Sequence, residues 1–363
     1  MKVVFVVNDA TLGGAQTFLC NLASSWCVED EIHLIVLLDK GPLSDRYDQA
    51  FATTTYLSVR RSVVSAVFSF RRALARIEPD VVHSHLLQAD LLNNFFTPRR
   101  YRKFTTHHTT GVTKHDPLAT RLIVKILALF GRRFEQQVLC DASCAEFLAH
   151  NRFRTRRVTT IENGIPLIEE PADSPQQNTF INVARFHPMK DHKNLLLAFE
   201  RFLQIHPGWL LRCLGEGVTA VNPELAALLA EIEARSPEAR NSISLEGANA
   251  DPVREIAKSS ALVISSAYGE AAPVVALEAA SVAVPIISTR VGGAAALCES
   301  AALSAAPGDP AALAVAMGEF ASLSADRRRE VAKRTWKRVH ATYDIRDTAR
   351  RYRLLYESHG ELL

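Results

Sequence analysis

The sequence lacks the cysteine pairs and long apolar runs that define several protein classes. Its six cysteines include no Cys-x-x-Cys pair, and no second pair stands beside Cys140 and Cys144 to complete a zinc site. The longest apolar stretches, near residues 63–70 and 122–130, are far shorter than the roughly 20 residues that span a bilayer. We therefore expect reduced core thiols in a cytoplasmic protein, and no helix that crosses a membrane.

Several short motifs are also missing. The chain has no G-x-G-x-x-G fingerprint, which disfavours a Rossmann oxidoreductase, and no recognisable nucleic-acid-binding module, so we expect no nucleic-acid partner. It has no Asp-x-Asp motif, so we expect no essential metal and no bound cofactor. At its start, the apolar run Val3–Val7 is too short for a secretory signal and is typical of a buried strand.

The composition is that of a two-domain globular protein. Of the 363 residues, 48% are hydrophobic and 22% are charged, which is enough apolar material for two cores of ordinary size. Short apolar runs alternate with longer helical patterns, and this alternation predicts parallel sheets covered by helices on both faces. The strands that we expect are 3–7, 32–38, 81–85, 104–106 and 158–162 in the first half, and 180–184, 210–214, 243–245, 262–265 and 285–288 in the second.

A segment without apolar periodicity separates the two halves. Residues 167–178 include two prolines and two adjacent glutamines, which predict an interdomain linker. We therefore expect one Rossmann-like domain over residues 1–165 and another over residues 178–340, facing each other across a cleft. The charged helical tail, from about residue 340 to residue 363, is expected to pack back on the first domain.

The net charge of +3 conceals an asymmetry between the halves. Residues 1–160 contain 21 Lys and Arg against 14 Asp and Glu, whereas the remainder contains 21 against 25. The basic residues of the first half form clusters such as Arg60-Arg61, Arg71-Arg72, Arg99-Arg100 and Arg132-Arg133. Two interpretations remain open: an ordinary solvated basic face, or a domain that rests on anionic lipid or on an anionic acceptor.

Glycine or charged residues follow the first strand of each half. Gly13 and Gly14 precede a helix, where the backbone can approach a ligand closely and the helix N-terminus favours negative charge. A tight turn without a ligand would use the same residues. Arg185 and Lys190 stand at the matching place in the second half, either as a clamp for a diphosphate or as solvated loop charges.

Two carboxylates lie further along the second half. Glu270 follows the strand predicted at 262–265, and Glu278 lies within the alanine-rich helical segment 274–283. Because a buried carboxylate needs partners, Glu278 is either tied to a neighbouring helix or directed at a ligand. Two carboxylates at one cleft would suit sugar hydroxyls, and the helix N-terminus near Val274 would suit phosphate oxygens.

Taken together, four segments resemble the retaining GT-B glycosyltransferases of group 1 and family 4, which carry a Glu-x7-Glu motif. The segments are Gly13–Gln16, Asn163–Ile165, Val183–Lys190 and Glu270–Gly293, in the order that the family has them. The resemblance covers nearly the whole chain. It implies an α/β fold of the GT-B type, with two Rossmann-like, doubly wound parallel-sheet domains on either side of a cleft.

The resemblance also implies roles for single residues. Arg185 and Lys190 would bind the donor diphosphate, Glu270 the hydroxyls of the transferred sugar, and Glu278 the ribose. The nucleotide base would meet the loop around residues 247–251. The catalytic residues implied are His107, Arg185, Lys190 and Glu270, and the donor-binding residues implied are Gly13, Gly14, Asn249, Ala272, Pro273, Val274 and Glu278.

The family also places a histidine at the edge of the first domain, after a strand. His107 and His108 both fit this position, but alternation along a strand directs only one of them into the cleft. We choose His107. His85, at the end of another strand, is interpreted as a supporting residue.

The sequence departs from the family pattern in three places. Ala271-Ala272-Pro273 replaces the usual Gly-aromatic-Gly, and Pro273 has no N–H to offer an anion. Three alanines, at residues 294–296, stand where a Pro-Glu pair is common, and Val284 stands where a glycine is common. These changes leave the identity of the donor sugar open.

The expected function is hexosyl transfer with retention of configuration. The donor would be a UDP-sugar or, as a second choice, a GDP-sugar, and the acceptor a hydroxyl on a glycan, a lipid-linked sugar or a small molecule in cell-surface polysaccharide or glycoconjugate synthesis. The leaving phosphate would act as base while Arg185 and Lys190 stabilise its charge. Alternatives are a catalytically silent sugar-nucleotide-binding subunit and a sugar-nucleotide epimerase. Contact with the cytoplasmic face of an anionic membrane is a further hypothesis.

Overall fold

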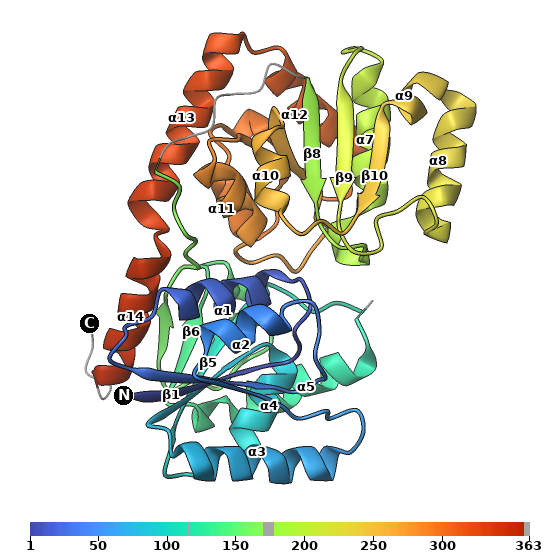
Figure 1. The fold of residues 1–363 in the computed structure, drawn as a ribbon. Coiled ribbons are helices and arrows are strands. Elements are labelled where there is room, and N and C mark those ends of the chain that lie inside the picture. Colours follow the sequence, from blue (N-terminus) through green and yellow to red (C-terminus); the bar gives the residue numbers. More distant parts are fainter. Residues whose placement is uncertain (115, 170–177, 359–363) are drawn as a thin grey trace. The chain divides into compact units, whose positions relative to one another are not determined.

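The computed structural model describes residues 1–114, 116–169 and 178–358. The chain forms two compact units, one of Met1–Pro166 with Tyr343–Leu363 and the other of Leu167–Thr342 (Figure 1). The corresponding predicted boundaries are residues 165 and 340, and residues 170–177 of the predicted linker lie outside the described residues. Each unit is built on its own sheet.

The sheet of the first unit has seven strands in the order β3-β2-β1-β4-β5-β6-β7, and neighbouring strands run parallel. Their bounds are β1 (Lys2–Val7), β2 (Glu31–Val36), β3 (Thr53–Tyr56), β4 (Val81–His85), β5 (Arg102–His107), β6 (Gln136–Leu139) and β7 (Val158–Thr160). In the register, Val3 pairs with Val81 and Val7 with His85, so β1 and β4 end side by side. The strand order reverses between these two strands.

The sheet of the second unit repeats this arrangement with six parallel strands in the order β10-β9-β8-β11-β12-β13. Their bounds are β8 (Thr179–Val183), β9 (Leu210–Leu214), β10 (Ile243–Gly247), β11 (Ala261–Ile264), β12 (Ile286–Thr289) and β13 (Ser304–Ala305). The strand order reverses between β8 and β11. The two units therefore share a topology, with the reversal beside the first strand of each.

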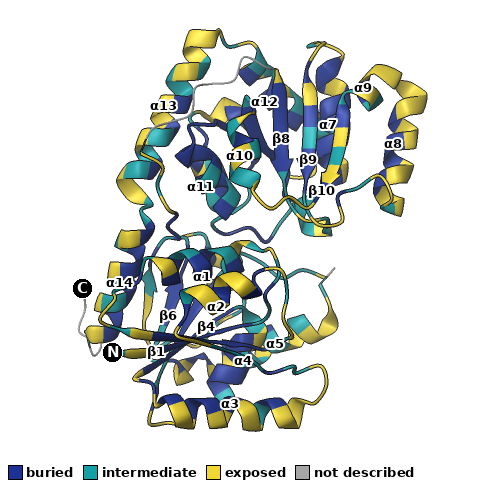
Figure 2. Cartoon of the chain, viewed as in Figure 1, coloured by how far each residue is buried: buried dark blue, intermediate teal, exposed yellow. Residues whose placement is uncertain are grey.

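Helices cover both faces of each sheet, as a doubly wound fold requires (Figure 1). The first unit has α1 (Gly14–Ser24), α2 (Ser44–Ala50), α3 (Val63–Ile77), α4 (Leu87–Phe96), α5 (Leu118–Phe130), η1 (Gly131–Arg133), α6 (Cys144–His150) and α14 (Ile345–Glu357). Helix α1 packs on α2 and α14, whereas α4 packs on α3 and α5. Figure 2 shows that buried residues follow the sheet strands and alternate with exposed residues along these helices.

Several helices of the second unit begin at side chains that cap them. The helices of this unit are η2 (Pro188–Lys190), α7 (His192–Leu203), α8 (Pro223–Arg235), α9 (Pro237–Asn241), α10 (Pro252–Ala257), α11 (Val274–Ser281), η3 (Gly292–Leu297), η4 (Ala301–Leu303), α12 (Pro310–Ala321) and α13 (Ala325–Thr342). Asn222 and Asp309 each accept backbone N–H bonds and are each followed by a proline, which suits the first turn of a helix. These local signals explain why α8 begins at Pro223 and α12 at Pro310.

The predicted strands are all present, with ends shifted by one or two residues, but β3, β6 and β13 were not predicted. The sequence of β3, TTTY, carries no aliphatic side chain, and its residues are exposed or half-buried. Strand β6 begins with Gln136 and Gln137, and Gln137 is buried because its side chain bonds to His107. Apolar periodicity does not detect strands of this kind.

The charged tail forms two helices instead of the single helical stretch expected. Asp344 interrupts it and caps α14 by accepting the N–H of Arg346, at the boundary between the two units. Ile165 bonds through its backbone to Tyr343 and Ile345, so the end of the chain returns to the first unit. Gly164 permits this close approach, because a Cβ there would lie 2.5 Å from the Thr348 hydroxyl.

Candidate functional site

The reversal of strand order defines one candidate binding place in each unit. In an open parallel sheet, ligands bind beyond the carboxyl ends of the strands where the order reverses. In the first unit that place follows β1 and β4, and in the second unit it follows β8 and β11. Gly13 lies in the turn after β1, and His85 is the last residue of β4. In the second unit, Lys190 lies in the segment after β8 and Glu270 in the loop after β11.

Lys190 and Glu270 form an ion pair in the second unit, although 80 residues separate them in the chain. Their side chains are 18% and 8% exposed. The structure thus brings together two residues that were predicted to bind different parts of one donor. A cation and a carboxylate at the rim of a parallel sheet offer one group for a phosphate and one for sugar hydroxyls.

Hydrogen bonds hold the two loops that carry this pair. The Ser265 hydroxyl donates to the Lys190 carbonyl at 2.7 Å, and the Ala267 N–H donates to the Met189 carbonyl at 2.8 Å. The Ser266 hydroxyl donates to Glu270 Oε1 at 2.8 Å. These contacts position the ion pair. Ser266 was not predicted, because nothing in its sequence context separates it from an ordinary loop serine.

The glycines after β12 support the backbone of Glu270. Gly292 has φ +60°, and a Cβ at this residue would lie 2.2 Å from the Glu270 carbonyl oxygen. The Gly293 N–H donates to the Ala271 carbonyl at 2.6 Å. A glycine is therefore required where this turn passes the Glu270 loop.

The remaining residues predicted in the second unit lie around this pair. Arg185 is exposed just beyond β8, and Ala272 and Pro273 lead into α11. Helix α11 begins at Val274, and its cap residue, Pro273, offers no side-chain cap. Its first backbone N–H groups, at the positive end of the helix dipole, can therefore donate to an anion. Glu278, half-buried, lies in the second turn of the same helix.

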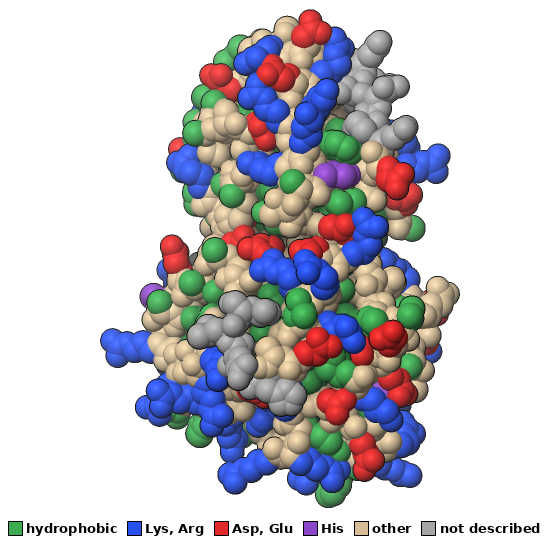
Figure 3. Space-filling model, turned by 90° about the vertical axis from the view of Figure 1, so that its left-hand side faces the viewer, with side chains coloured by type: hydrophobic (Ala, Val, Ile, Leu, Met, Phe, Trp, Pro, Cys, Tyr) green, Lys and Arg blue, Asp and Glu red, His purple; other side chains and the backbone are tan. Residues whose placement is uncertain are grey.

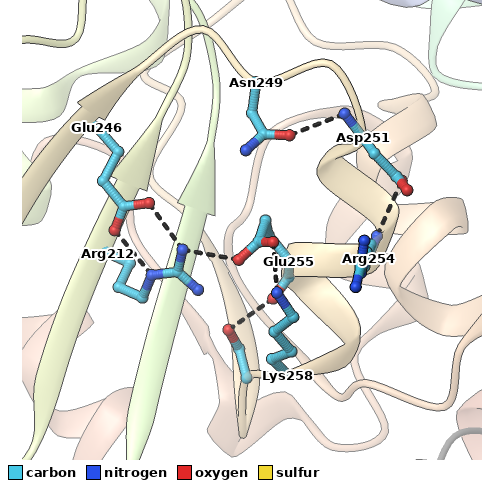
Figure 4. A network of polar contacts seen from close by, with 8 residues as sticks. Arg212, Glu246, Asn249, Asp251, Arg254, Glu255 and Lys258 are labelled. Atoms are coloured by element: carbon cyan, nitrogen blue, oxygen red, sulfur yellow. Dashed lines mark hydrogen bonds and ion pairs between the residues drawn. The ribbon is translucent and has the colours of Figure 1, made fainter.

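The loop after β10 was predicted to meet the nucleotide base. Asn249 is exposed, and its Oδ1 accepts the Asp251 N–H at 2.8 Å (Figure 4). Asp251 in turn caps α10 by accepting the Arg254 N–H. Below the loop, Arg212 forms a two-pronged bond with Glu246 and also bonds Glu255, which ties β9 and β10 to α10.

In the first unit the glycine turn opens α1. Gly13 is the cap residue and Gly14 the first residue of the helix, which has no side-chain cap. Asp9 accepts from the Thr11 N–H and from the Gln16 side chain, and Asn8 accepts the Ala89 N–H at the start of α4. The turn between β1 and α1 is thus tied to the loop after β4.

The structure separates the two histidines at the end of β5, His107 and His108. His107 is 3% exposed, and its Nε2 bonds to Gln137 while its ring packs on Phe147 and Phe153. Its side chain therefore lies in the core on the side of α6. His108 ends up on the opposite face, partly exposed beside Phe18 of α1. Alternation thus directs the two side chains to opposite sides, and His108 is the one that packs against α1; the assignment of His107 to the reaction stays a prediction.

His108 belongs to a row of histidines beneath α1 and α14. His85 Nδ1 lies 2.9 Å from His108 Nε2, and the rings of His83 and His85 stack with centroids 4.7 Å apart. His83 bonds to the Tyr356 hydroxyl of α14 at 2.5 Å. His85, predicted as a supporting residue, thus contacts His108 directly.

Burial keeps these histidines neutral. It lowers the pKa of His107 to about 4 and, with the neighbouring His107, the pKa of His108 to about 3. Burial also holds the pKa values of His83 and His85 well below 6.5. At neutral pH the rim of the first sheet therefore offers uncharged hydrogen-bonding groups.

No metal-binding or membrane-spanning feature is found in the part of the chain that the structure describes. There, no cluster of three or more His, Cys, Asp or Glu side chains could hold a metal ion. None of the described helices is both long enough and apolar enough to cross a bilayer. None of the six cysteines forms a disulfide bond with another. The expectation that activity needs no metal remains a prediction.

Two parallel α/β units, each with polar residues at the reversal of strand order, are typical of the GT-B fold. Family models agree: residues 12–168 match Glycosyltransferase Family 4, and residues 167–338 match Glycosyl transferases group 1. The chain belongs to this GT-B glycosyltransferase family, whose members transfer sugars.

Solved structures with this fold cover the chain almost completely. HepE from Anabaena, in complex with UDP and glucose, has a TM-score of 0.82 at 16% identity and covers 99% of this chain and 100% of its own. Sucrose-phosphate synthase from Thermosynechococcus elongatus has a TM-score of 0.79 at 15% identity, with 99% of each chain covered. At such identities the likeness shows the fold.

One curated relative matches over a shorter segment. An exopolysaccharide phosphotransferase from Streptomyces coelicolor is 32% identical over 132 residues, which are 36% of this chain and 13% of the relative. The match thus spans a small part of that protein's length.

Proposed function

We propose that the protein transfers a hexosyl residue with retention of configuration from a UDP-sugar to a hydroxyl acceptor, in the synthesis of a cell-surface polysaccharide or glycoconjugate. A GDP-sugar is the second choice of donor. The observation that carries the proposal is the Lys190–Glu270 pair at the carboxyl ends of β8 and β11, beside the start of α11. UDP in the HepE complexes and the exopolysaccharide relative support the choice of donor and pathway.

Each group has a role that its chemistry supports. Arg185, Lys190 and the N-terminus of α11 would stabilise the charge that develops on the departing diphosphate. Glu270 would accept hydrogen bonds from the sugar hydroxyls, and Glu278 from the ribose. The departing phosphate would take the proton of the attacking hydroxyl, so no side chain is needed as base. Metal ions are not required when cationic side chains neutralise the diphosphate.

In the first unit we assign His108 the role first given to His107. As a neutral imidazole it would hydrogen-bond the reacting end of the sugar, and His85 would orient it through the 2.9 Å contact. The acceptor, a glycan, a lipid-linked sugar or a small molecule, would approach from this unit. We also propose peripheral contact with an anionic membrane, because exposed basic clusters of the first unit such as Arg71-Arg72 can bind lipid phosphates.

The donor is tested by thermal unfolding with UDP, GDP or ADP, in buffer with EDTA. A nucleotide that binds the native state alone raises its stability by about 2.7 kcal/mol at a hundredfold excess over Kd. We expect a shift with UDP that Arg185→Ala abolishes. Arg201→Ala, at an exposed arginine on α7, is the matched control and should keep the shift.

Two further readouts complete the test. The anomeric configuration of the first sugar released from the donor, followed by NMR, reports retention or inversion. A shift with UDP but no donor hydrolysis and no transfer would instead support a silent binding subunit. Absence of any nucleotide shift would contradict the proposed donor site.

A further inference from the structure

One hydrogen bond joins two neutral histidines at the rim of the first sheet. His85 Nδ1 lies 2.9 Å from His108 Nε2. Burial holds the pKa of His85 well below 6.5 and lowers the pKa of His108 to about 3, so each ring carries a single proton at neutral pH. One of the two facing nitrogens therefore donates and the other accepts. Which of them donates decides what the other nitrogen of His108 can offer to a ligand.

The second ring nitrogen of His85 distinguishes the two arrangements. The His85 ring packs among other rings, with its centroid 5.9 Å from that of Phe5, 6.2 Å from that of Phe18 and 4.7 Å from that of His83. Its Nε2 is buried and has no hydrogen-bond partner among the described residues. A proton on this nitrogen would be a buried N–H without an acceptor, which is rare in proteins. A bare nitrogen leaves only a lone pair unpaired and costs less.

From these contacts we propose that His85 is a positioning residue that donates its Nδ1–H to His108 Nε2 and thereby keeps the proton of His108 on Nδ1. His108 then offers a ligand one N–H donor and no free lone pair. Such a ring can hydrogen-bond an oxygen of a sugar or a phosphate, but it cannot take up a proton while Nε2 accepts from His85. Its role in turnover rests on the proposed function, in which the departing phosphate is the base, whereas the hydrogen-bond arrangement does not.

The ring on which His85 stacks is itself held at both nitrogens. His83 Nε2 lies 2.8 Å from the Thr106 hydroxyl, and His83 Nδ1 lies 2.5 Å from the Tyr356 hydroxyl. Two hydrogen bonds on opposite sides of an imidazole leave it one orientation. The rings of His83 and His85 are inclined by only 17° to each other, so a fixed His83 also fixes the plane of His85.

Helix α14 brings Tyr356 to this network from the end of the chain. The buried residues of α14 recur every three or four positions and include Tyr352 and Tyr356. Figure 3 shows charged side chains on the face of the molecule where Figure 1 places this helix, so α14 has a polar outer side. Tyr356 and His83 are 273 residues apart in the sequence. The tail helix therefore helps to orient His108 through His83 and His85.

The neighbouring His107 provides an internal comparison, because its contacts favour the opposite tautomer. The side-chain N–H groups of Gln137 donate to the carbonyls of Gly131 and Arg154, so its Oε1 faces His107. His107 Nε2 lies 2.8 Å from this oxygen and must donate to it, since a carbonyl oxygen only accepts. Two adjacent histidines thus carry their protons on different ring nitrogens.

The first test is NMR of the ring nitrogens in the full chain without ligand, with isotopically labelled histidine. A nitrogen that carries a proton and one that does not differ widely in chemical shift. Each ring is assigned by the signals that disappear when that histidine is replaced by asparagine. We expect the proton on Nδ1 in His85 and His108, and on Nε2 in His107. A proton on Nε2 of His85 or of His108 would overturn the proposal.

The second test compares variants of His85 that remove or keep the donor. His85→Leu cannot donate and should lower turnover about tenfold, the rate equivalent of one lost hydrogen bond. His85→Asn keeps an amide N–H near the position of Nδ1 and should stay within about threefold of the wild type. The matched control is His33→Leu, at a buried histidine of β2 whose Nδ1 lies 2.8 Å from the Thr53 hydroxyl. This control should turn over like the wild type.

A third comparison tests the contribution of α14. Tyr356→Phe removes the hydroxyl that bonds His83 and should lower turnover by about threefold, because it acts on His108 only through two other rings. Tyr101→Phe is the control, since it removes a hydroxyl from another buried tyrosine of the first unit, one that donates to the Leu74 carbonyl at 3.2 Å. Circular dichroism and thermal unfolding check that every variant is folded.

The outcomes distinguish this proposal from the proposed function. Nδ1–H on His85 and His108 in a protein that transfers no sugar would support the hydrogen-bond arrangement and contradict the transfer alone. Equal turnover by His85→Leu and His33→Leu would overturn the positioning role. So would a His85→Asn variant as slow as His85→Leu, because the packing of the ring, and not its N–H, would then explain the loss.

Discussion

The two units share one topology but carry different side chains at the reversal of strand order, charged in the second unit and neutral in the first. Both sheets reverse their strand order beside their first strand, and both direct polar residues to that place. In the second unit these residues are Arg185, Lys190 and Glu270, whereas in the first unit they are the histidines His85 and His108, which burial keeps neutral. The fold therefore determines where a ligand can bind, and the side chains determine whether the place suits a charged or an uncharged group.

The largest expected effect is a loss of turnover on substitution of Glu270, one of the charged residues of the second unit. Glu270→Gln keeps the shape of the side chain but removes the charge that pairs with Lys190. We expect turnover to fall by about 10²–10³-fold, the range for losing one preorganised electrostatic contact at a reacting centre. Initial rates with a saturating donor check this, and Glu330→Gln on α13 is the control. Unchanged turnover would remove Glu270 from the reaction.

The second prediction separates the two histidines of β5. His108→Ala should lower turnover by about 10²-fold with little change in stability, as for loss of a positioned hydrogen-bonding group. His107→Ala should instead destabilise the first unit by about 2–3 kcal/mol, because it leaves a cavity and an unpaired Gln137. Kinetics and urea unfolding of both variants check the pair. If the two effects are reversed, the first choice of His107 was right.

The smallest expected effect is a pH dependence of the first unit. Its histidines bind protons in the unfolded state near pH 6.5 but stay neutral when folded, since the pKa of folded His107 is about 4. Their contribution to stability is complete above pH 6.5 and is lost as the pH falls from there toward their folded pKa values. Burial raises the pKa of Asp90 to about 7, which acts in the opposite direction, but one carboxyl opposes five histidines, since burial also lowers the pKa of His33.

We expect a net loss of about 1–2 kcal/mol between pH 7 and pH 6. Urea unfolding followed by fluorescence checks it. Trp26 is in the first unit, and Trp209→Phe with Trp336→Phe makes it the single reporter. The second unit, followed through Trp209 with the other two replaced by Phe, should change less over this range. Equal changes in both units would contradict the assignment to the buried histidines.

Much of the fold could be predicted, because its signals are local. Apolar strands such as Val3–Val7 and capped helices such as Pro223–Arg235 are encoded by neighbouring residues. Strand β3 was not predicted because its threonines give no apolar pattern. Its place in the sheet comes from backbone pairing with β2, which the sequence of the strand does not reveal. Lys190 and Glu270 were both predicted from sequence segments, but their pairing was not, since it joins two loops far apart in the chain.

The sequence by itself determined the class of the protein. The alternation of strands and helices, and the order of the glycine and charged segments, are patterns of local residues that need no tertiary contact to be recognised. The tertiary structure alone decided which histidine of β5 faces the glycine turn, and that Tyr352 and Tyr356 return to cover β4 and β5. A side chain's face depends on strand register and on what packs against it. These are properties of the assembled sheet, and no short segment of the chain carries them.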